Sequence, residues 1–258
     1  MPLQTLSKDE SSFLEKVLIN QYMKPIQKRI DIWVEKSGNP QYGWKIVFDH
    51  LDEILKDFQD DLDKILDIRL SAGEISDKKQ AIRSISGNLF VNTIIYVFIQ
   101  NKLVGNIPEG IFINNKSVVP EFEKVFTITI GEHLEKLNIN LIIYSLKENS
   151  ELNKCIALFP LQSDGNQFKK AYKWKLLMEI AMSDCEVRDK YEITYDPPTV
   201  PLVCFVTVNF YNEINNPQHR GMFKFFDRAF IGKPIDPQIT NFISPLSTLI
   251  GFVNEKLI

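Results

Sequence analysis

The sequence lacks the features of exported and membrane-spanning proteins. Its first residues, MPLQTLSKDESSFLEK, do not follow the basic-then-apolar layout of a signal peptide. The longest apolar run, Thr93 to Ile99, is far shorter than the roughly 20 residues that a membrane helix needs. We therefore expect a soluble, intracellular, cytoplasmic protein with no membrane partner.

Cysteine is also scarce, and no excess of positive charge marks the chain. Cys155, Cys185 and Cys204 share no metal-like spacing, and their odd number argues against a disulfide framework, so we interpret them as reduced thiols. The formal net charge of -3 excludes a global basic field of the kind that marks many nucleic-acid-binding proteins. A local basic surface is still compatible with this balance.

Common catalytic motifs are missing. The chain has no G-x-x-x-x-G-K-[ST], G-x-G-x-x-G, H-E-x-x-H or C-x-x-C. His50, His133 and His219 are isolated in the sequence, and we interpret each as a surface or capping residue. These absences exclude the easily recognised nucleotide-binding and zinc-hydrolase sites.

Helical periodicity dominates the first 77 residues. A helix is expected from Ser7 or Asp9, a break at 37–43, and a second helical segment over 44–70 with apolar residues every three or four positions. The opposite face of that segment is acidic, which permits either a metal site or a solvated face, and we favour the solvated face. Its carboxylates are Asp49, Asp52, Glu53, Asp57, Asp60, Asp61, Asp63 and Asp67.

The rest of the chain alternates helices with strand-forming runs. Residues 78–101 are apolar on most faces after Gly87, which predicts a buried central helix. Residues 138–181 read as an apolar strand, a polar turn, a second strand and a helix, and 200–210 as a further buried strand. The order predicts an α/β (α+β) fold with a mixed central sheet flanked by helices. We expect residues 1–77 to form a helical region and 78–258 the core, in one compact unit.

The helix after the second strand is basic and aromatic. Lysines interleaved with Tyr172 and Trp174 could contact a phosphate backbone and stack on bases. An ordinary amphipathic helix with solvated lysines is an equal interpretation, and composition does not decide between them. The candidate DNA-binding residues are Lys169, Lys170, Lys173, Trp174 and Lys175.

The order of these segments resembles the PD-(D/E)XK nuclease core of type II restriction endonucleases. Asn140–Ser145, Ile156–Ser163 and Lys170–Leu177 are similar to its strand, strand and helix, and Val203–Asn209 to the strand that follows. Phe226–Phe230 resembles its later "lDgvY" strand. Arg83–Val91 is similar to an upstream "GnaFE" helix that carries an acidic residue. The resemblance implies a restriction-endonuclease-like core and, by function, a DNA-binding nuclease of a restriction-modification system.

The positions that would carry the chemistry depart from the family pattern. The metal-binding acid of the first strand falls at Asn140, the acid-x-lysine of the second at Pro160-Leu161-Gln162, and the helix acid at Val91. Phosphodiester hydrolysis with Mg²⁺ needs carboxylate oxygens for the ion and usually a lysine beside the attacking water. The matching residues cannot fill these roles.

Two explanations follow from the resemblance, and we favour the first. Either the fold has lost its chemistry and kept its DNA-facing surface, or the functional groups have migrated. Migrated catalytic groups could be Asp164, Lys169 and Lys170, and migrated metal ligands Asp164, Glu121 and Glu123, although each acid also fits a turn or surface position.

The partners expected from the resemblance are double-stranded DNA and a second subunit. Mg²⁺ is implied only if the protein is active. A homodimer would match a palindromic site, and an inactive chain could instead pair with an active subunit. An interaction protein with no nucleic-acid role is the alternative class, supported by the near-neutral charge and the incomplete catalytic set.

Overall fold

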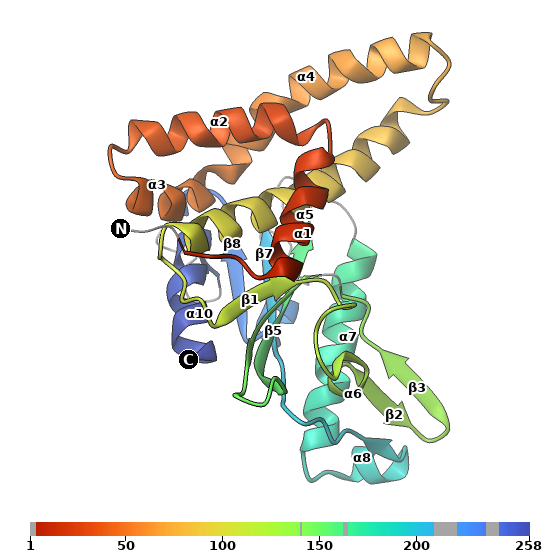
Figure 1. The fold of residues 1–258 in the computed structure, drawn as a ribbon. Coiled ribbons are helices and arrows are strands. Elements are labelled where there is room, and N and C mark those ends of the chain that lie inside the picture. The colour runs from red at the N-terminus through yellow and green to blue at the C-terminus, as the bar shows by residue number, and fades with distance from the viewer. Residues whose placement is uncertain (1–3, 140, 162–164, 209–220, 236–242) are drawn as a thin grey trace.

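The structure is a computed structural model that describes residues 4–139, 141–161, 165–208, 221–235 and 243–258. For residues 161 and 165–168 only the backbone is described. A layer of helices lies over one end of a central sheet, as Figure 1 shows.

The helical layer contains α1 (Lys8–Ile19), α2 (Met23–Lys36), α3 (Pro40–Ile46), the 3₁₀ turn η1 (Val47–His50), α4 (Leu51–Ser71) and α5 (Lys78–Leu103). Ser7 and Glu10 form a capping box that starts α1. The helix expected from Ser7 or Asp9 ends at Ile19 and is followed by a separate helix, because the side chain of Asn20 accepts a hydrogen bond from the amide of Tyr22 and ends the first. The expected break at 37–43 contains the start of α3, where Pro40 sits at the first turn behind an Asn39 cap.

The main sheet has six strands in the order β1-β4-β5-β7-β8-β9. These are β1 (Ile111–Asn114), β4 (Ile142–Leu146), β5 (Leu152–Leu161), β7 (Leu202–Thr207), β8 (Arg228–Ile231) and β9 (Ser244–Pro245). β1, β4 and β5 are antiparallel, and β5, β7, β8 and β9 are parallel. The mixed central sheet predicted from the sequence is confirmed.

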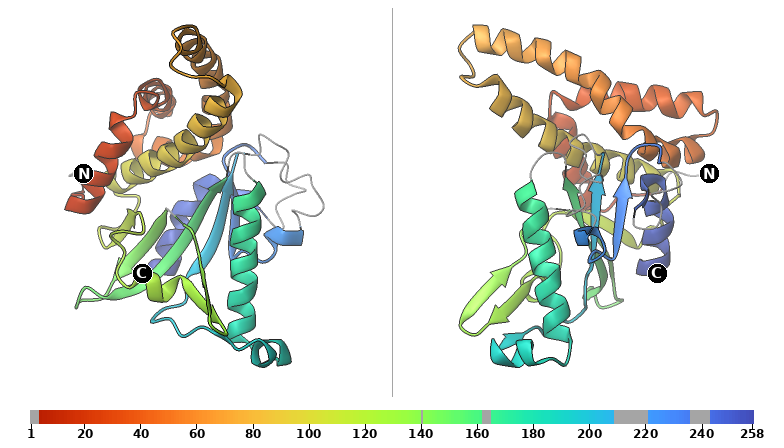
Figure 2. Two further views of the ribbon diagram at one scale, coloured as in Figure 1. Left: turned by 90° about the vertical axis from the view of Figure 1, so that its right-hand side faces the viewer. Right: turned by 180° about the vertical axis from the view of Figure 1, so that it is seen from behind.

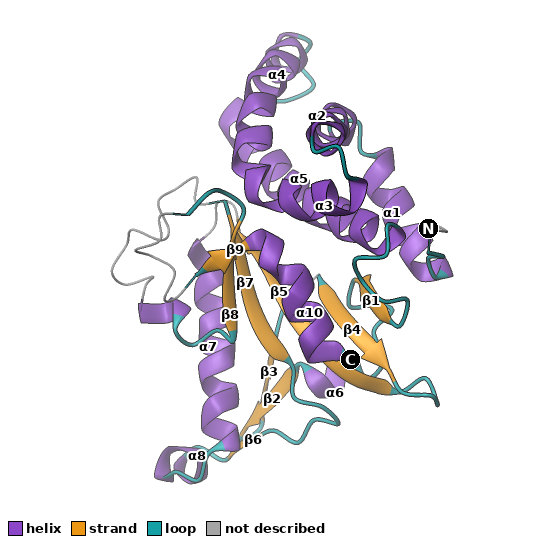
Figure 3. Cartoon of the chain, turned by 90° about the vertical axis from the view of Figure 1, so that its left-hand side faces the viewer, coloured by secondary structure: helices purple, strands orange, loops and turns teal. Residues whose placement is uncertain are grey.

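Each face of the sheet buries its own set of apolar side chains. Residues such as Ile143, Leu158 and Val206 pack with α5 and with α10 (Leu249–Leu257), which lies across the sheet in Figure 3. The alternate residues, such as Phe159 and Phe205, pack under α7 (Gly165–Met182). Strands covered on both faces explain why the sequence runs are continuously apolar.

A smaller sheet lies beside α7, in the order β3-β2-β6. It contains β2 (Thr127–Ile130), β3 (His133–Lys136) and β6 (Ile193–Thr194), with the short helices α6 (Phe122–Val125) and α8 (Glu186–Lys190) nearby. Residues 122–130 thus form a helical turn followed by a strand.

Helix α5 is the predicted central helix. By length and composition it could cross a membrane, and half of its most apolar window is buried inside the fold. Its inner end is held by a buried ion pair, in which the Lys102 ammonium lies 2.9 Å from both carboxylate oxygens of Glu10 and donates to the carbonyl of Ile111 at 2.7 Å. These contacts place α5 as a core helix.

Candidate nucleic-acid interface

The candidate site lies at one edge of the main sheet. Because β5, β7 and β8 are parallel, their carboxyl ends meet there, and antiparallel β4 begins beside the end of β5. We call this the strand-end edge: the carboxyl ends of these three strands and the start of β4. Helix α7 begins at the same edge, four residues after β5 ends. In open sheets, ligands bind at such carboxyl ends.

The N-terminal helices are fixed against this edge. The amide of Asp52, in the first turn of α4, donates to the carbonyl of Gly232 at 2.9 Å, and the amide of Ser247 donates to Asp49 at 2.8 Å. A Cβ on Gly232 would lie 3.1 Å from the carbonyl oxygen of Phe48, so glycine permits the close approach. The helical layer is therefore built onto the edge where the resemblance locates the chemistry.

Some of the positions that the resemblance assigns to catalysis lie outside the described residues, whereas that of the helix acid lies within them. Asn140, Gln162 and Asp164 lie outside the described residues. Val91, at the position of the family's helix acid, is a half-buried residue of α5 that packs against the core.

The lysines of α7 divide into two groups. Lys169 and Lys170 are exposed in its first turns and form no ion pair with any described residue. Lys173 is also exposed but lies 3.1 Å from the carboxylate of Glu135 on β3. These three side chains are accessible to a phosphate backbone, and their role in DNA binding stays a prediction.

Trp174 and Lys175 instead face the interior. Trp174 is 1% exposed and its ring lies among Phe126 and Tyr195, so in this conformation it offers no stacking surface. Lys175 is 3% exposed and its ammonium lies 3.0 Å from Asp227 and 2.8 Å from Glu179. Asp227 also accepts the amide of Val203 at 2.6 Å, so Lys175 joins α7 to β7 and β8.

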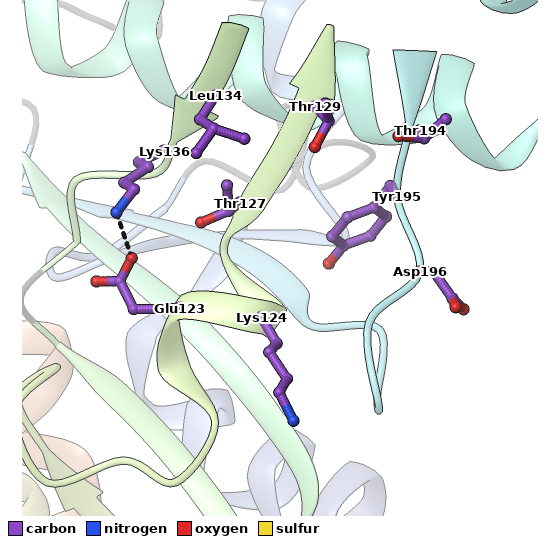
Figure 4. A pocket seen from close by; sticks show the side chains of 9 residues that line it. All are labelled: Glu123, Lys124, Thr127, Thr129, Leu134, Lys136, Thr194, Tyr195 and Asp196. Atoms are coloured by element: carbon purple, nitrogen blue, oxygen red, sulfur yellow. Dashed lines mark hydrogen bonds and ion pairs between the residues drawn. The ribbon is translucent and has the colours of Figure 1, made fainter. Parts of the chain in front are cut away.

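Glu121 and Glu123, the proposed migrated metal ligands, lie on and beside α6. Glu121 precedes the helix in a left-handed conformation (φ 56°) and pairs with Lys124 at 3.3 Å. Glu123 pairs with Lys136 at 2.6 Å (Figure 4). In the part of the chain that the structure describes, neither carboxylate bonds to Lys169 or Lys170.

The same glutamate borders an open pocket on the outer face of the small sheet. Threonine, lysine and tyrosine side chains surround it, and Figure 4 shows them on three strands and α6. The pocket belongs to the small sheet and contains no residue of the strand-end edge. Its lining is Glu123, Lys124, Thr127, Thr129, Leu134, Lys136, Thr194, Tyr195 and Asp196.

Asn114, which the sequence did not single out, is buried at the strand-end edge. It ends β1 opposite Ile142, the first residue of β4, and is 2% exposed. Its side-chain oxygen accepts the amide of Asn115, whereas its amide nitrogen has no partner among the described residues. The sequence signal that could have identified it is a polar residue at the end of an otherwise apolar strand.

Burial holds nearby titratable groups in their neutral forms. Desolvation, reinforced by the carboxylates of Glu10 and Asp9, raises the pKa of Tyr144 on β4 to about 12. Desolvation also raises the pKa of the Cys155 thiol to about 12. Neither group can serve as a base or thiolate near neutral pH.

The described residues at the edge do not supply a site for Mg²⁺, which prefers several carboxylate oxygens. Around it lie apolar side chains and the amide of Asn114, and no group of three or more acidic, histidine or cysteine side chains suited to a metal occurs in the described ranges. Since the residues do not fit the ion, we derive no metal-dependent step from them.

Comparison with known proteins gives one family. A family model described as BsaWI restriction endonuclease type 2 matches residues 113–252, more than half of the chain. The matched range runs from β1 to α10 and includes the whole strand-end edge. A search of curated proteins finds no match.

Proposed function

Because the chain belongs to the BsaWI restriction endonuclease type 2 family, we propose that it binds duplex DNA at the strand-end edge as part of a restriction system. The observation that carries the proposal is the start of α7. The exposed ammonium groups of Lys169 and Lys170, which form no ion pair with any described residue, lie in the first turns of α7, close to where β5 ends. Cations so placed can neutralise phosphates on both sides of a bound strand.

The proposal has two forms, which differ in chemistry. In the first, the protein cleaves phosphodiester bonds with Mg²⁺, the ion on which the family typically depends, through migrated groups such as Asp164 and Lys169. In the second, it is a catalytically silent homologue that recognises DNA. The second is supported by Val91 at the helix-acid position and by the ion pairs that engage Glu121 and Glu123. In both forms the protein acts as a homodimer. A silent chain could instead form a dimer with an active subunit.

A paired assay tests the proposal. Binding of a labelled mixed-sequence duplex would be measured by fluorescence anisotropy at 50 and 200 mM salt, and cleavage of a long DNA of complex sequence with Mg²⁺ and with Mn²⁺. Salt-sensitive binding is expected in both forms. Discrete fragments would establish the active form, and binding without fragments the silent form. A protein that does neither would contradict the proposal and favour an interaction protein with no nucleic-acid role.

A further inference from the structure

The outer half of α5 presents an exposed, polar face beside the strand-end edge. Helices α4 and α5 form a hairpin, and Figures 1 and 2 show its outer part projecting past the sheet on the side where α7 begins. The two helices differ sharply in charge. α4 carries seven carboxylates in 21 residues, whereas α5 carries none in 26.

The helical period fixes which way this face points. Phe98 lies in the core and Lys102 bonds to β1, so they mark the side of α5 that faces the sheet. At about 100° per residue, Gln80, Ser84 and Gly87 fall within roughly 40° of Phe98, Arg83 within roughly 60° and Asn88 within roughly 80°. The sheet-facing side of α5 thus continues beyond the sheet as an overhang face. It consists of Gln80, Arg83, Ser84, Gly87 and Asn88.

Two of the three cations in the outer part of α5 form no ion pair with any described residue. The third, Lys78, is engaged by Asp63 and Asp67, and Arg69 on the neighbouring α4 is engaged by Glu74. Lys79 and Arg83 are exposed and form no ion pair with any described residue. On the other side of the strand-end edge, the first half of α7 likewise carries lysines and no carboxylate before Glu179.

Gly87 gives a second reason to expect a partner. Glycine destabilises a helix interior relative to alanine. Yet a Cβ added at Gly87 would meet no atom of the described residues within 4 Å, so no packing in that part of the chain requires its absence. A missing side chain on such a face is useful where another molecule comes close to the backbone.

We infer that the overhang face of α5 is the second wall of the duplex-binding site, opposite the start of α7. Arg83 contacts a phosphate, Ser84 and Asn88 supply hydrogen bonds to the backbone, and Gly87 lets the strand approach the helix. Duplex DNA is the occupant because Arg83 on one wall and Lys169 and Lys170 on the other are exposed and form no ion pair with any described residue. In addition, α5 and α7 flank the edge at which the proposed function places the DNA. The inference rests on the proposed function and extends it to residues outside the matched range 113–252.

A charge-matched pair of variants tests the role of Arg83. Arg83→Gln and Lys64→Gln each remove one exposed cation from the same hairpin, but Lys64 lies on α4, on the other side. With a labelled mixed-sequence duplex, Arg83→Gln is expected to weaken binding several-fold and to lower the log–log salt slope by about 0.9. Lys64→Gln should leave both unchanged. Equal effects of the two substitutions on a wild-type protein that binds DNA would overturn this inference alone, and a wild type that does not bind would overturn the proposed function as well.

Gly87 supports a test in which stability and binding move in opposite directions. Gly87→Gln should raise the Tm by about 1–3 °C, because glutamine is the better helix former, and yet weaken duplex binding several-fold. Gly251→Gln is the control, since Gly251 is an exposed glycine of α10 that also meets nothing within 4 Å. It should not weaken binding. If Gly87→Gln stabilises the protein and binds DNA as well as the wild type, the close approach is wrong.

Discussion

Buried charge is the clearest feature at the scale of single residues. Glu10 and Lys102 are 0% and 1% exposed by their side chains, and the amide of Ile113 and the ring of Phe112 complete the surroundings of the pair. A pair of this kind contributes little net stability against an apolar equivalent, but breaking it leaves one charge buried without a partner. It therefore fixes where α1 and β1 meet α5. Nothing in the sequence revealed it, because its members are 92 positions apart.

Removing the cation of this buried pair should destabilise the fold. Lys102→Met leaves the Glu10 carboxylate buried alone and should lower the free energy of unfolding by about 3–5 kcal/mol, measured by urea denaturation. Adding Glu10→Gln should recover part of the loss, because a neutral amide is less costly to bury. Lys16→Met, on the exposed side of α1, is the control and should change stability by about 0.5 kcal/mol or less. A Lys102→Met protein as stable as the control would show that the pair is not formed.

At the scale of elements, α7 combines two tasks in one helix. Lys175 and Trp174 bind it to the sheet, whereas Lys169 and Lys170 remain at the surface. Helical spacing predicts that Lys175 points away from the face shared by Lys169 and Lys170. It could not predict that Lys175 is buried against Asp227, because that partner comes 52 residues later.

Substitution of the buried lysine should lower stability, whereas substitution of the two exposed lysines should weaken DNA binding. Lys175→Met removes the cation that pairs with Asp227 and should lower the urea midpoint, because Asp227 stays part-buried without its partner. The double variant Lys169→Gln/Lys170→Gln should keep the wild-type midpoint and lower the salt slope of duplex binding by about 1.8. Anisotropy titrations and denaturation curves on the same preparations measure both. A double variant that loses stability but not DNA affinity would show that the start of α7 does not contact DNA.

Long elements were predictable and short ones were not. The long apolar runs of β5 and β7, the helical period of α4 and the length of the apolar segment in α5 made the mixed sheet and its covering helices predictable from the sequence. The strands of the small sheet span four residues or fewer, which is too short for a period to be read from the sequence. The basic helix was recognised, but not that Trp174 faces inward. The overhang face was missed because exposed polar residues on a helix carry no periodic signal of their own.

At the scale of the whole molecule, the helical layer and the sheet share one core. The cluster that contains Met23, Phe48 and Phe58 of the N-terminal helices also contains Ile156, Val206 and Leu249 of the sheet and α10. The 1–77 and 78–258 regions outlined from the sequence are therefore joined by continuous packing and by the Asp52–Gly232 hydrogen bond.

One core predicts one unfolding transition. Trp33 and Trp44 report on the helical layer, and Trp174 on the opposite face of the sheet. The double variant Trp33→Phe/Trp44→Phe leaves Trp174 as the only tryptophan, so its fluorescence follows the sheet while far-UV circular dichroism follows the helices. The two urea midpoints should coincide in this variant, as they should in the wild type.

Since α5 would lose its packing against α2 and α4, a chain of residues 78–258 alone should show no cooperative transition. Separate midpoints, or a folded 78–258 fragment, would mean that the helical layer is an independent domain docked on the nuclease core.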